Sequence, residues 1–293
     1  MKTIKAKIIG HGHPKIAILG CVHGDEIMGA KAIRELLKLP IVKGELHFII
    51  ANEPAKQKRQ RYLKHDLNRA FPGNPDGEAE HYLAHVLKQQ LAKMDLVIDL
   101  HATNSNFSDL AIITKLGQKE KQLLKLIPNQ KVALIRKAVF GGNDLISHTK
   151  LGLALEYGPN KTGKNYPQAV RDVKQILINL GIIAGEKTEA LEKDLYTVSG
   201  IYAVSKKFQP NKKLRNFELI KKGEAVGRES GKIIKSHTTF YPLFLGEGRY
   251  QKTLALISAK RKLVLKQTIN SAQSSQISQN NPNLIAKLGL KKV

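Results

Sequence analysis

The spacing of apolar residues divides the first two thirds of the chain into alternating strand-like and helix-like segments. Short apolar runs predict buried strands at 15–20, 46–51, 95–100, 110–114 and 151–155. Apolar residues three and four positions apart predict helices at 26–38, 78–93, 118–126 and 168–180. Strands that alternate with helices predict an α/β fold, which we expect to be a three-layer sandwich around a mixed, largely parallel sheet.

The pattern changes after about residue 190, where helical spacing becomes rare. Short strand-like segments follow at 196–204, 218–226, 232–236, 252–258 and 262–267. Residues 269–283 are rich in Ser, Gln and Asn, which predicts poor order, and a short helix-like segment at 284–290 ends the chain. We therefore expect a large domain at 1–194, a smaller β-rich domain at 195–268 and a polar, flexible tail at 269–293.

The chain is strongly basic, with 49 Lys and Arg against 24 Asp and Glu and a net charge of +25. Such an excess is typical of proteins that bind nucleic acid or an anionic substrate, but a lysine-rich solvated surface gives the same number. The basic residues are spread along the chain, with short clusters at 56–64, 206–213 and 260–262, and no nucleic-acid-binding motif accompanies them. We therefore favour an ordinary basic surface over a nucleic-acid partner.

The sequence predicts a cytoplasmic protein with no membrane partner. No apolar run approaches the roughly 18 residues that span a bilayer, and no continuous apolar stretch follows the N-terminal lysines as a signal peptide requires. A single cysteine excludes an intrachain disulfide and fits a reducing compartment. The sequence does not decide the oligomeric state, and a homo-oligomer is one of the states that it leaves open.

Side chains that can bind a metal follow two of the predicted strands. His23 and Glu26 lie in the turn after strand 15–20, and His101 follows strand 95–100. Because ligands bind at the carboxyl ends of the strands in open α/β sheets, we expect these three side chains to converge. Two His and one Glu with an open position form a catalytic zinc set. The alternative for the His-x-x-Glu pair alone is a solvated helix N-terminus.

Two further segments carry candidate chemistry. Glu156 ends strand 151–155, where a carboxylate is a good general base for a zinc-bound water, although an exposed strand-end glutamate is the alternative. A polar loop contains Arg61, Asn68 and Arg69. Arginine offers a planar fork matched to a carboxylate, and asparagine supplies both a donor and an acceptor. The loop therefore suits an anionic group, but by itself indicates only a polar loop.

Five short motifs occur in an order and at gaps that resemble those of the aspartoacylase/succinylglutamate desuccinylase family, within the zinc carboxypeptidase superfamily. They are H-G-D-E at 23–26, D-L-N-R-A-F at 66–71, D-L-H-A-T at 99–103, L-E-Y-G-P at 155–159 and Y-P-L-F-L-G-E-G-R-Y at 241–250. The resemblance spans residues from about 15 to 255. It implies a zinc-carboxypeptidase-like sandwich and a C-terminal domain that caps the cleft and excludes long peptides.

The resemblance also implies a role for each candidate residue. His23, Glu26 and His101 would bind one Zn²⁺ per chain, and Glu156 would be the general base. Arg61 would polarise the scissile carbonyl. Asn68 and Arg69 would bind the α-carboxylate, and Tyr250 would contact the polar groups of the substrate.

The reaction implied is hydrolysis of a small, anionic N-acyl amino acid, aspartate- or glutamate-like, to a free amino acid and a carboxylate, by attack of a zinc-bound water. One alternative keeps the zinc but cuts short peptides as a carboxypeptidase. Another, from a different class, is a basic nucleic-acid-binding protein with an inactive hydrolase fold.

The chain departs from the family pattern at one place. In aspartoacylases an arginine ten residues before the catalytic glutamate helps to bind the side-chain carboxylate of the substrate. The corresponding segment here, 144–150, contains no arginine, and His148 and Lys150 are the candidates to replace it. The amino acid and the acyl group of the substrate are therefore open.

Overall fold

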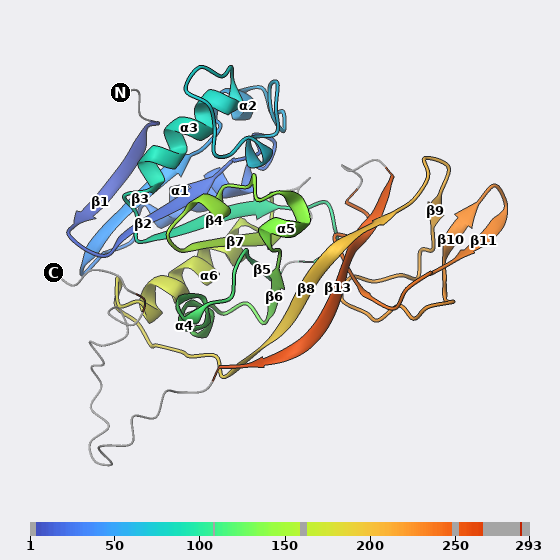
Figure 1. The fold of residues 1–293 in the computed structure, drawn as a ribbon. Helices are drawn as coiled ribbons and strands as arrows, with labels where there is room; N and C mark the ends of the chain where they lie inside the picture. The colour runs from blue at the N-terminus through green and yellow to red at the C-terminus, as the bar shows by residue number, and fades with distance from the viewer. Residues whose placement is uncertain (1–3, 108, 159–162, 248–251, 266–287, 289–293) are drawn as a thin grey trace, which may run out of the picture.

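The computed structural model describes residues 4–107, 109–158, 163–247, 252–265 and 288 (Figure 1). Its centre is a ten-stranded mixed sheet in the order β1-β3-β2-β4-β7-β5-β6-β8-β13-β12, in which β3, β2, β4 and β7 are parallel neighbours. The strands are β1 (Ala6–His11), β2 (Lys15–Gly20), β3 (Gly44–Ile50), β4 (Leu96–Ala102), β5 (Leu110–Ile113), β6 (Lys131–Leu134), β7 (Gly152–Tyr157), β8 (Glu192–Ala203), β12 (Tyr241–Leu243) and β13 (Thr253–Val264).

Helices cover both faces of this sheet. The longer ones are α1 (Met28–Leu36), α3 (Glu80–Leu91), α4 (Gln118–Leu126) and α6 (Tyr166–Asn179), and shorter turns are α2 (Glu53–Gln57), η1 (Leu67–Arg69), α5 (Lys137–Phe140) and η2 (Ile146–His148). Side chains alternate between the faces of a strand. On β2, Ile16 and Ile18 pack in one apolar cluster with α1, α4 and α6, while Ala17 and Leu19 pack in another with α3. The three-layer α/β sandwich is thereby confirmed.

The predicted elements of the first two thirds match observed ones closely. Strand 15–20 is β2 and helix 118–126 is α4, residue for residue, and the other predicted boundaries differ by a few residues. The prediction of a strand at 218–226 is wrong for most of its length, because a turn at Gly223, with φ of 90°, precedes β10 (Ala225–Glu229). The two strands predicted at 252–258 and 262–267 are one long strand, β13.

The C-terminal part of the chain extends the large sheet into a β-rich lobe (Figure 1). Strands β8 and β13 pair along their length, and a three-stranded sheet lies beyond them, with β9 (Gln209–Pro210), β10 and β11 (Lys232–Lys235) in the order β11-β10-β9. Because β8 also pairs with β6, the lobe continues from the main sheet, and the domain division at 194/195 stays a prediction. The predicted tail at 269–293 lies, apart from Leu288, outside the described residues.

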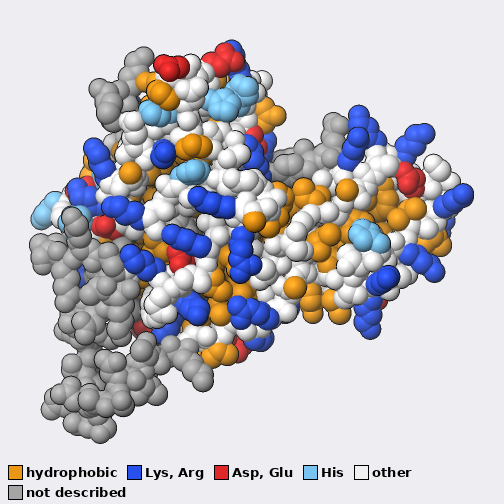
Figure 2. All heavy atoms as spheres, viewed as in Figure 1, with side chains coloured by type: hydrophobic (Ala, Val, Ile, Leu, Met, Phe, Trp, Pro, Cys, Tyr) orange, Lys and Arg blue, Asp and Glu red, His pale blue; other side chains and the backbone are white. Residues whose placement is uncertain are grey.

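Lysine and arginine side chains are distributed over both the sandwich and the lobe on the face seen in Figure 2. None of the helices in the described ranges combines the length and the apolar character needed to cross a bilayer.

Candidate metal centre

The turn that carries His23 and Glu26 is fixed by close packing at two glycines. A Cβ at Gly20, the last residue of β2, would lie 2.7 Å from the backbone of Gly29 in α1. A Cβ at Gly24 would lie 2.3 Å from the backbone carbon of Ala55. A larger residue at either position would push these backbones apart. The glycines therefore hold the turn against α1 and α2, so that both candidate ligands lie directly after the end of β2.

His101 and Glu156 lie side by side on neighbouring parallel strands. On β4, Ile98 and Leu100 pack in the apolar cluster on the α1 side of the sheet. Because side chains alternate along a strand, Asp99 and His101 face the other way. Glu156 on β7 is the direct register partner of His101. Both side chains therefore reach the same cavity at the carboxyl edge of the sheet.

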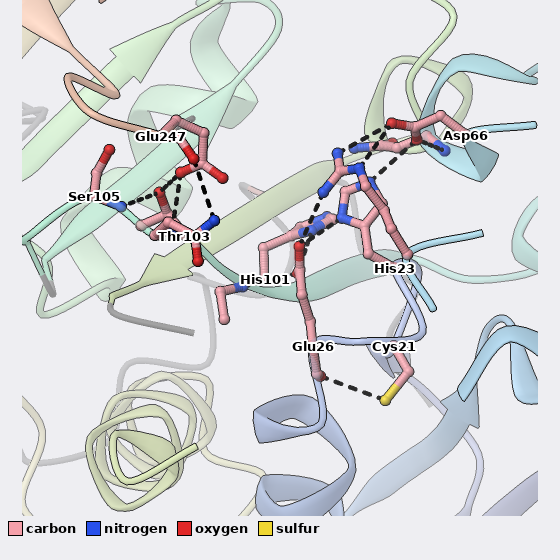
Figure 3. Close-up of polar contacts among 12 residues, drawn as sticks. Cys21, His23, Glu26, Asp66, His101, Thr103, Ser105 and Glu247 are labelled. Carbon is pink, nitrogen blue, oxygen red and sulfur yellow. Dashed lines mark hydrogen bonds and ion pairs between the residues drawn. The ribbon is translucent and has the colours of Figure 1, made fainter. Parts of the chain in front are cut away.

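His23, Glu26 and His101 converge on one point (Figure 3). One possible ligand atom from each lies within 4.8 Å of the others, and the three residues are only 5%, 2% and 2% exposed. The Nδ1 atoms of His23 and His101 lie 2.7 Å and 3.1 Å from the two carboxylate oxygens of Glu26. Two imidazoles and one carboxylate are common zinc donors, so the residues present fit a metal ion of this kind.

The other ring nitrogen of each histidine, Nε2, lies beside the carboxylate of an aspartate. His23 Nε2 lies 3.1 Å from Asp66 Oδ1, and His101 Nε2 lies 2.7 Å from Asp99 Oδ2. Such partners orient metal-binding histidines and raise their basicity, and here they leave Nδ1 of both rings facing Glu26. Both aspartates occur within the sequence motifs, but neither was predicted to have a role. The signal for Asp99 was its spacing from His101, because residues two apart on a strand share a face.

The charges of this cluster are balanced. Burial disfavours the ionised carboxylate of Glu26, but His23 and His101 lower its pKa well below the usual value. Burial likewise disfavours the charged form of His101, but Asp99 and Glu26 raise its pKa well above the usual value. Each buried charge therefore has an opposite charge beside it.

Glu156 has a different environment from Glu26. Burial raises its pKa to about 7, the charges of Glu26 and Glu247 act in the same direction, and His101 opposes them. A carboxyl group with a pKa near neutrality can both accept and release a proton at neutral pH, as general acid–base catalysis requires.

The metal-capable cluster lines part of a cavity of about 330 Å³. Every candidate site residue within the described part of the chain lines this cavity, namely His23, Glu26, Arg61, Asn68, Arg69, His101 and Glu156. Tyr250 lies outside the described residues. The structure therefore brings together residues from four separate motifs of the sequence and Arg61, which lies before the second of these motifs.

Arg61 and Asn68 are held in place by neighbouring groups. Arg61 Nη1 lies 3.4 Å from Glu26 Oε1, and its Nε and Nη2 atoms donate to Asp66 Oδ2 at 3.2 Å and 3.0 Å. Asn68 Oδ1 accepts a hydrogen bond of 2.9 Å from the backbone N–H of Leu145, which fixes the orientation of its amide. The polar loop of the sequence is thereby tied both to the metal-capable cluster and to the segment before η2.

The C-terminal region closes one side of the cavity. The carboxylate of Glu247 accepts hydrogen bonds from the Thr103 hydroxyl and, at 2.9 Å, from the backbone N–H of Asn104 (Figure 3). The Ser105 hydroxyl donates to the carbonyl oxygen of Leu245 at 2.9 Å. Glu247, for which the sequence predicted no role, therefore joins the C-terminal region to the segment that follows His101.

Neither proposed replacement for the missing arginine lines the cavity. His148 Nε2 lies 2.9 Å from the carbonyl oxygen of Gly142, and the Lys150 side chain is exposed. The cavity is lined instead by Ile146, ten residues before Glu156, and by Arg136. Arg136 precedes α5 and is exposed, so it was not recognisable from the sequence pattern.

Comparison with known proteins supports the resemblance found in the sequence. A sequence model described as the succinylglutamate desuccinylase/aspartoacylase catalytic domain matches residues 12–179. The chain is 25% identical over 289 residues to a probable aspartoacylase of Nostoc sp., in a match that covers 85% of this chain and 97% of that protein. It is also 25% identical over 288 residues to a Homo sapiens N-acyl-aromatic-L-amino acid amidohydrolase (carboxylate-forming), with 84% and 90% covered.

The fold is similar to that of a solved relative. The crystal structure of murine aminoacylase 3 superimposes with a TM-score of 0.73 at 24% sequence identity, covering 87% of this chain and 98% of that one. Because the match covers 87% of this chain, it extends beyond the sandwich.

Proposed function

The chain belongs to the succinylglutamate desuccinylase/aspartoacylase family, and from this premise we propose that it is a zinc-dependent amidohydrolase. It cleaves the amide bond of a small N-acyl amino acid and releases a free amino acid and a carboxylate. The observation that carries this proposal is the cavity in which Glu156 lies on the strand beside His101, with the buried cluster of His23, Glu26 and His101 lining the same cavity.

The three-residue cluster supports zinc as the cofactor, with one ion per chain. A zinc ion held there would act as a Lewis acid toward the amide carbonyl and lower the pKa of a water molecule. Asp66 and Asp99 hold the two histidines with Nδ1 directed toward Glu26, and this orientation favours binding through Nδ1.

Glu156 is the proposed general base. Its carboxylate takes a proton from the attacking water and then delivers it to the nitrogen of the leaving amine. Its pKa of about 7 suits both steps, because the group exchanges a proton readily near neutral pH.

Cationic and amide groups of the polar loop bind the substrate in this proposal. Arg61 stabilises the negative charge that develops on the amide oxygen, and its ion pairs with Glu26 and Asp66 hold it beside the reacting centre. Asn68 and Arg69 bind the α-carboxylate. Tyr250, outside the described residues, is the proposed contact from the C-terminal region.

The names of the relatives support the substrate class but do not decide the amino acid. One relative is named an aspartoacylase, and another is named for N-acyl aromatic amino acids. These proteins share an N-acyl amino acid as substrate and differ in its side chain.

A hydrolysis screen with metal analysis tests the proposal. Acetyl-, succinyl- and formyl-amino acids and short peptides are assayed with the purified protein, and zinc is measured on the same sample. We expect about one zinc per chain and hydrolysis of acyl amino acids. Cleavage of peptides in place of acyl amino acids would identify a carboxypeptidase. Retention of nucleic acid without zinc or hydrolysis would support the binding-protein alternative.

Glu156→Gln tests the assigned base, with the exposed Glu189→Gln as the matched control. We expect Glu156→Gln to lower kcat by about 10²–10⁴-fold while zinc is retained, and Glu189→Gln to resemble the parent protein. Hydrolysis by Glu156→Gln at the parent rate would show that another group is the base.

A further inference from the structure

One part of the cavity lining, here called the apolar wall, consists of apolar side chains and so differs from the charged metal-capable cluster. Six of its residues are Ile112, Ile135, Phe140, Ile146, Phe244 and Leu256. Apart from Ile146, these side chains are half-buried and pack on one apolar cluster, whose buried members are Leu110, Ala133, Tyr196, Val198 and Leu243. Five of the six side chains are therefore supported from behind by one apolar cluster, and Ile146 packs in another. A ligand group that covers the wall gains from the removal of apolar area from water.

The wall begins beside the loop proposed to bind the α-carboxylate. The hydrogen bond from the Leu145 backbone to Asn68 Oδ1 places the next residue, Ile146, close to Asn68. In an amino acid, the side chain and the α-carboxylate are bonded to the same carbon atom. A substrate whose carboxylate is bound at Asn68 and Arg69 therefore directs its side chain toward the region of Ile146.

Among the described residues that line the cavity, the cations do not favour a carboxylate at this wall. Arg61 is paired with Glu26 and Asp66, and Arg69 lies in the proposed α-carboxylate site. Arg136 is exposed, so water competes for its charge. A side-chain carboxylate placed against isoleucine and phenylalanine would lose hydration, and none of the described lining residues is a buried, unengaged cation that would replace it, which makes this placement costly.

We propose that this wall is the side-chain subsite and that the substrate is an N-acyl amino acid with an aliphatic or aromatic side chain. This inference rests on the proposed function, because the position of the side chain follows from the proposed site for the α-carboxylate. It narrows the substrate class and separates this chain from an enzyme selective for acyl-aspartate or acyl-glutamate.

The test compares kcat/KM for N-acetyl-L-phenylalanine, N-acetyl-L-leucine, N-acetyl-glycine and N-acetyl-L-aspartate. We expect phenylalanine and leucine to exceed glycine by about 10–200-fold, and aspartate to lie below glycine. Equal or faster hydrolysis of the aspartate compound would overturn the inference while leaving the proposed function intact. Hydrolysis of none of the acyl amino acids would instead refute the proposed function.

The acyl group is the other part of the substrate that could cover the wall. N-hexanoyl-glycine is therefore assayed beside N-acetyl-glycine. A large gain from the longer acyl chain, with no gain from phenylalanine or leucine, would assign the wall to the acyl group and overturn the side-chain assignment.

Variants at two positions locate the preference in the structure. Ile146→Arg introduces a cation into the wall, and we expect the phenylalanine-to-aspartate ratio of kcat/KM to fall at least about 10-fold, whereas Ile146→Leu keeps it. Arg136→Gln should leave the order of preference unchanged, and a loss of aspartate hydrolysis specific to this variant would mark Arg136 as the recognition residue and contradict the proposal. If Ile146→Arg does not fold, product inhibition is measured with the unaltered protein. We expect stronger inhibition by L-phenylalanine than by L-aspartate.

Discussion

Strand β7 carries two adjacent residues, Glu156 and Tyr157, that point to opposite faces of the large sheet, and ionisable groups surround each of them. On the face of Glu156 lie the candidate metal ligands and the cavity. On the other face, the Tyr157 hydroxyl donates a hydrogen bond of 2.9 Å to Asp172 of α6. Lys193 is fully buried in β8, and its ammonium donates at 2.7 Å to the carbonyl oxygen of Ile127.

The candidate metal ligands and the ionisable groups on the other face differ in how their charges are compensated. At the candidate metal centre, opposite charges adjoin one another, so Glu26 keeps a pKa well below its usual value despite burial. On the other face, burial dominates, raising the pKa of Asp172 to about 6 and lowering that of Lys193 to about 8. Burial of an ionisable group therefore does not by itself identify a functional site. Convergence of several such groups on a cavity is the better criterion.

Loss of a metal ligand should give the largest effect on activity, and it directly tests the face of the sheet that carries Glu156. We expect His101→Ala to lose zinc and to lower hydrolysis by at least about 10³-fold, because only two of the three donors remain. Tyr157→Phe, on the opposite face of the sheet, is the matched control and should retain zinc and activity. Zinc content and kcat/KM are measured for both. Equal losses in the two variants would show that the comparison between the faces has no functional meaning.

Removal of a charge that orients a histidine should have a smaller effect. Asp99→Asn keeps the shape of the side chain but replaces the carboxylate beside His101 Nε2. We expect zinc affinity to fall by about 10–100-fold, the usual effect of losing such a partner, as measured by competition with a chelator. Asp172→Asn makes the same chemical change on the other face and should leave zinc affinity unaltered. An unchanged affinity in Asp99→Asn would mean that Asp99 does not orient the ligand.

The metal-capable cluster could be predicted from the sequence because its residues directly follow buried strands. His23 and His101 come after the predicted strands 15–20 and 95–100, and the rule that carboxyl ends of parallel strands share an edge brings them together. The same reasoning placed Glu156 at the end of β7, and Asp99 could have been recognised from its spacing to His101.

The apolar wall could not be predicted in this way. Its residues come from separate segments, including β5, the residue after β6, α5, η2 and β13, and only the tertiary fold brings these together. Strand β6 has four residues, too few to show a period, and it was not predicted. Lys193 was equally hidden, because nothing in the sequence around a single lysine distinguishes a buried position from an exposed one.

Replacement of the buried lysine should change stability and leave the metal centre alone. The folded-state pKa of Lys193, about 8, is below the ordinary value of 10.5, so the folded protein binds fewer protons than the unfolded chain between these pH values. The stability of the parent protein should therefore rise as pH increases from about 8 to 10.5. Lys193→Met should remove this rise. It should also increase the free energy of unfolding at pH 7 by about 1–2 kcal/mol, after allowance for the lost hydrogen bond.

Chemical denaturation at several pH values measures this effect, with the exposed Lys119→Met as the control. A pH dependence that persists in Lys193→Met would assign it to another group. Loss of zinc from this variant would show that the two faces of the sheet are coupled.

The smallest effect is expected from the charge of Asp172. Burial is the largest cause of its raised pKa, and the nearby Asp109 adds to it, while hydrogen bonds from Tyr157 and Asn129 act against it. Because the folded-state pKa of about 6 exceeds the ordinary value of 3.8, the folded protein binds more protons than the unfolded chain between these pH values. The contribution of Asp172 to stability is therefore present at low pH and is lost as pH rises through about 4 to 6.

Asp172→Asn should remove this loss, since the amide is uncharged at every pH and its oxygen can still accept the hydrogen bond from Tyr157. After allowance for solvent screening, we expect a gain of about 1 kcal/mol in the free energy of unfolding at pH 7 and no gain near pH 4. Denaturation curves at both pH values measure the difference, with kcat/KM followed on the same samples. A fall in kcat/KM approaching that expected for His101→Ala would contradict the division between the two faces, because Asp172 contacts Tyr157 on the face opposite the metal centre.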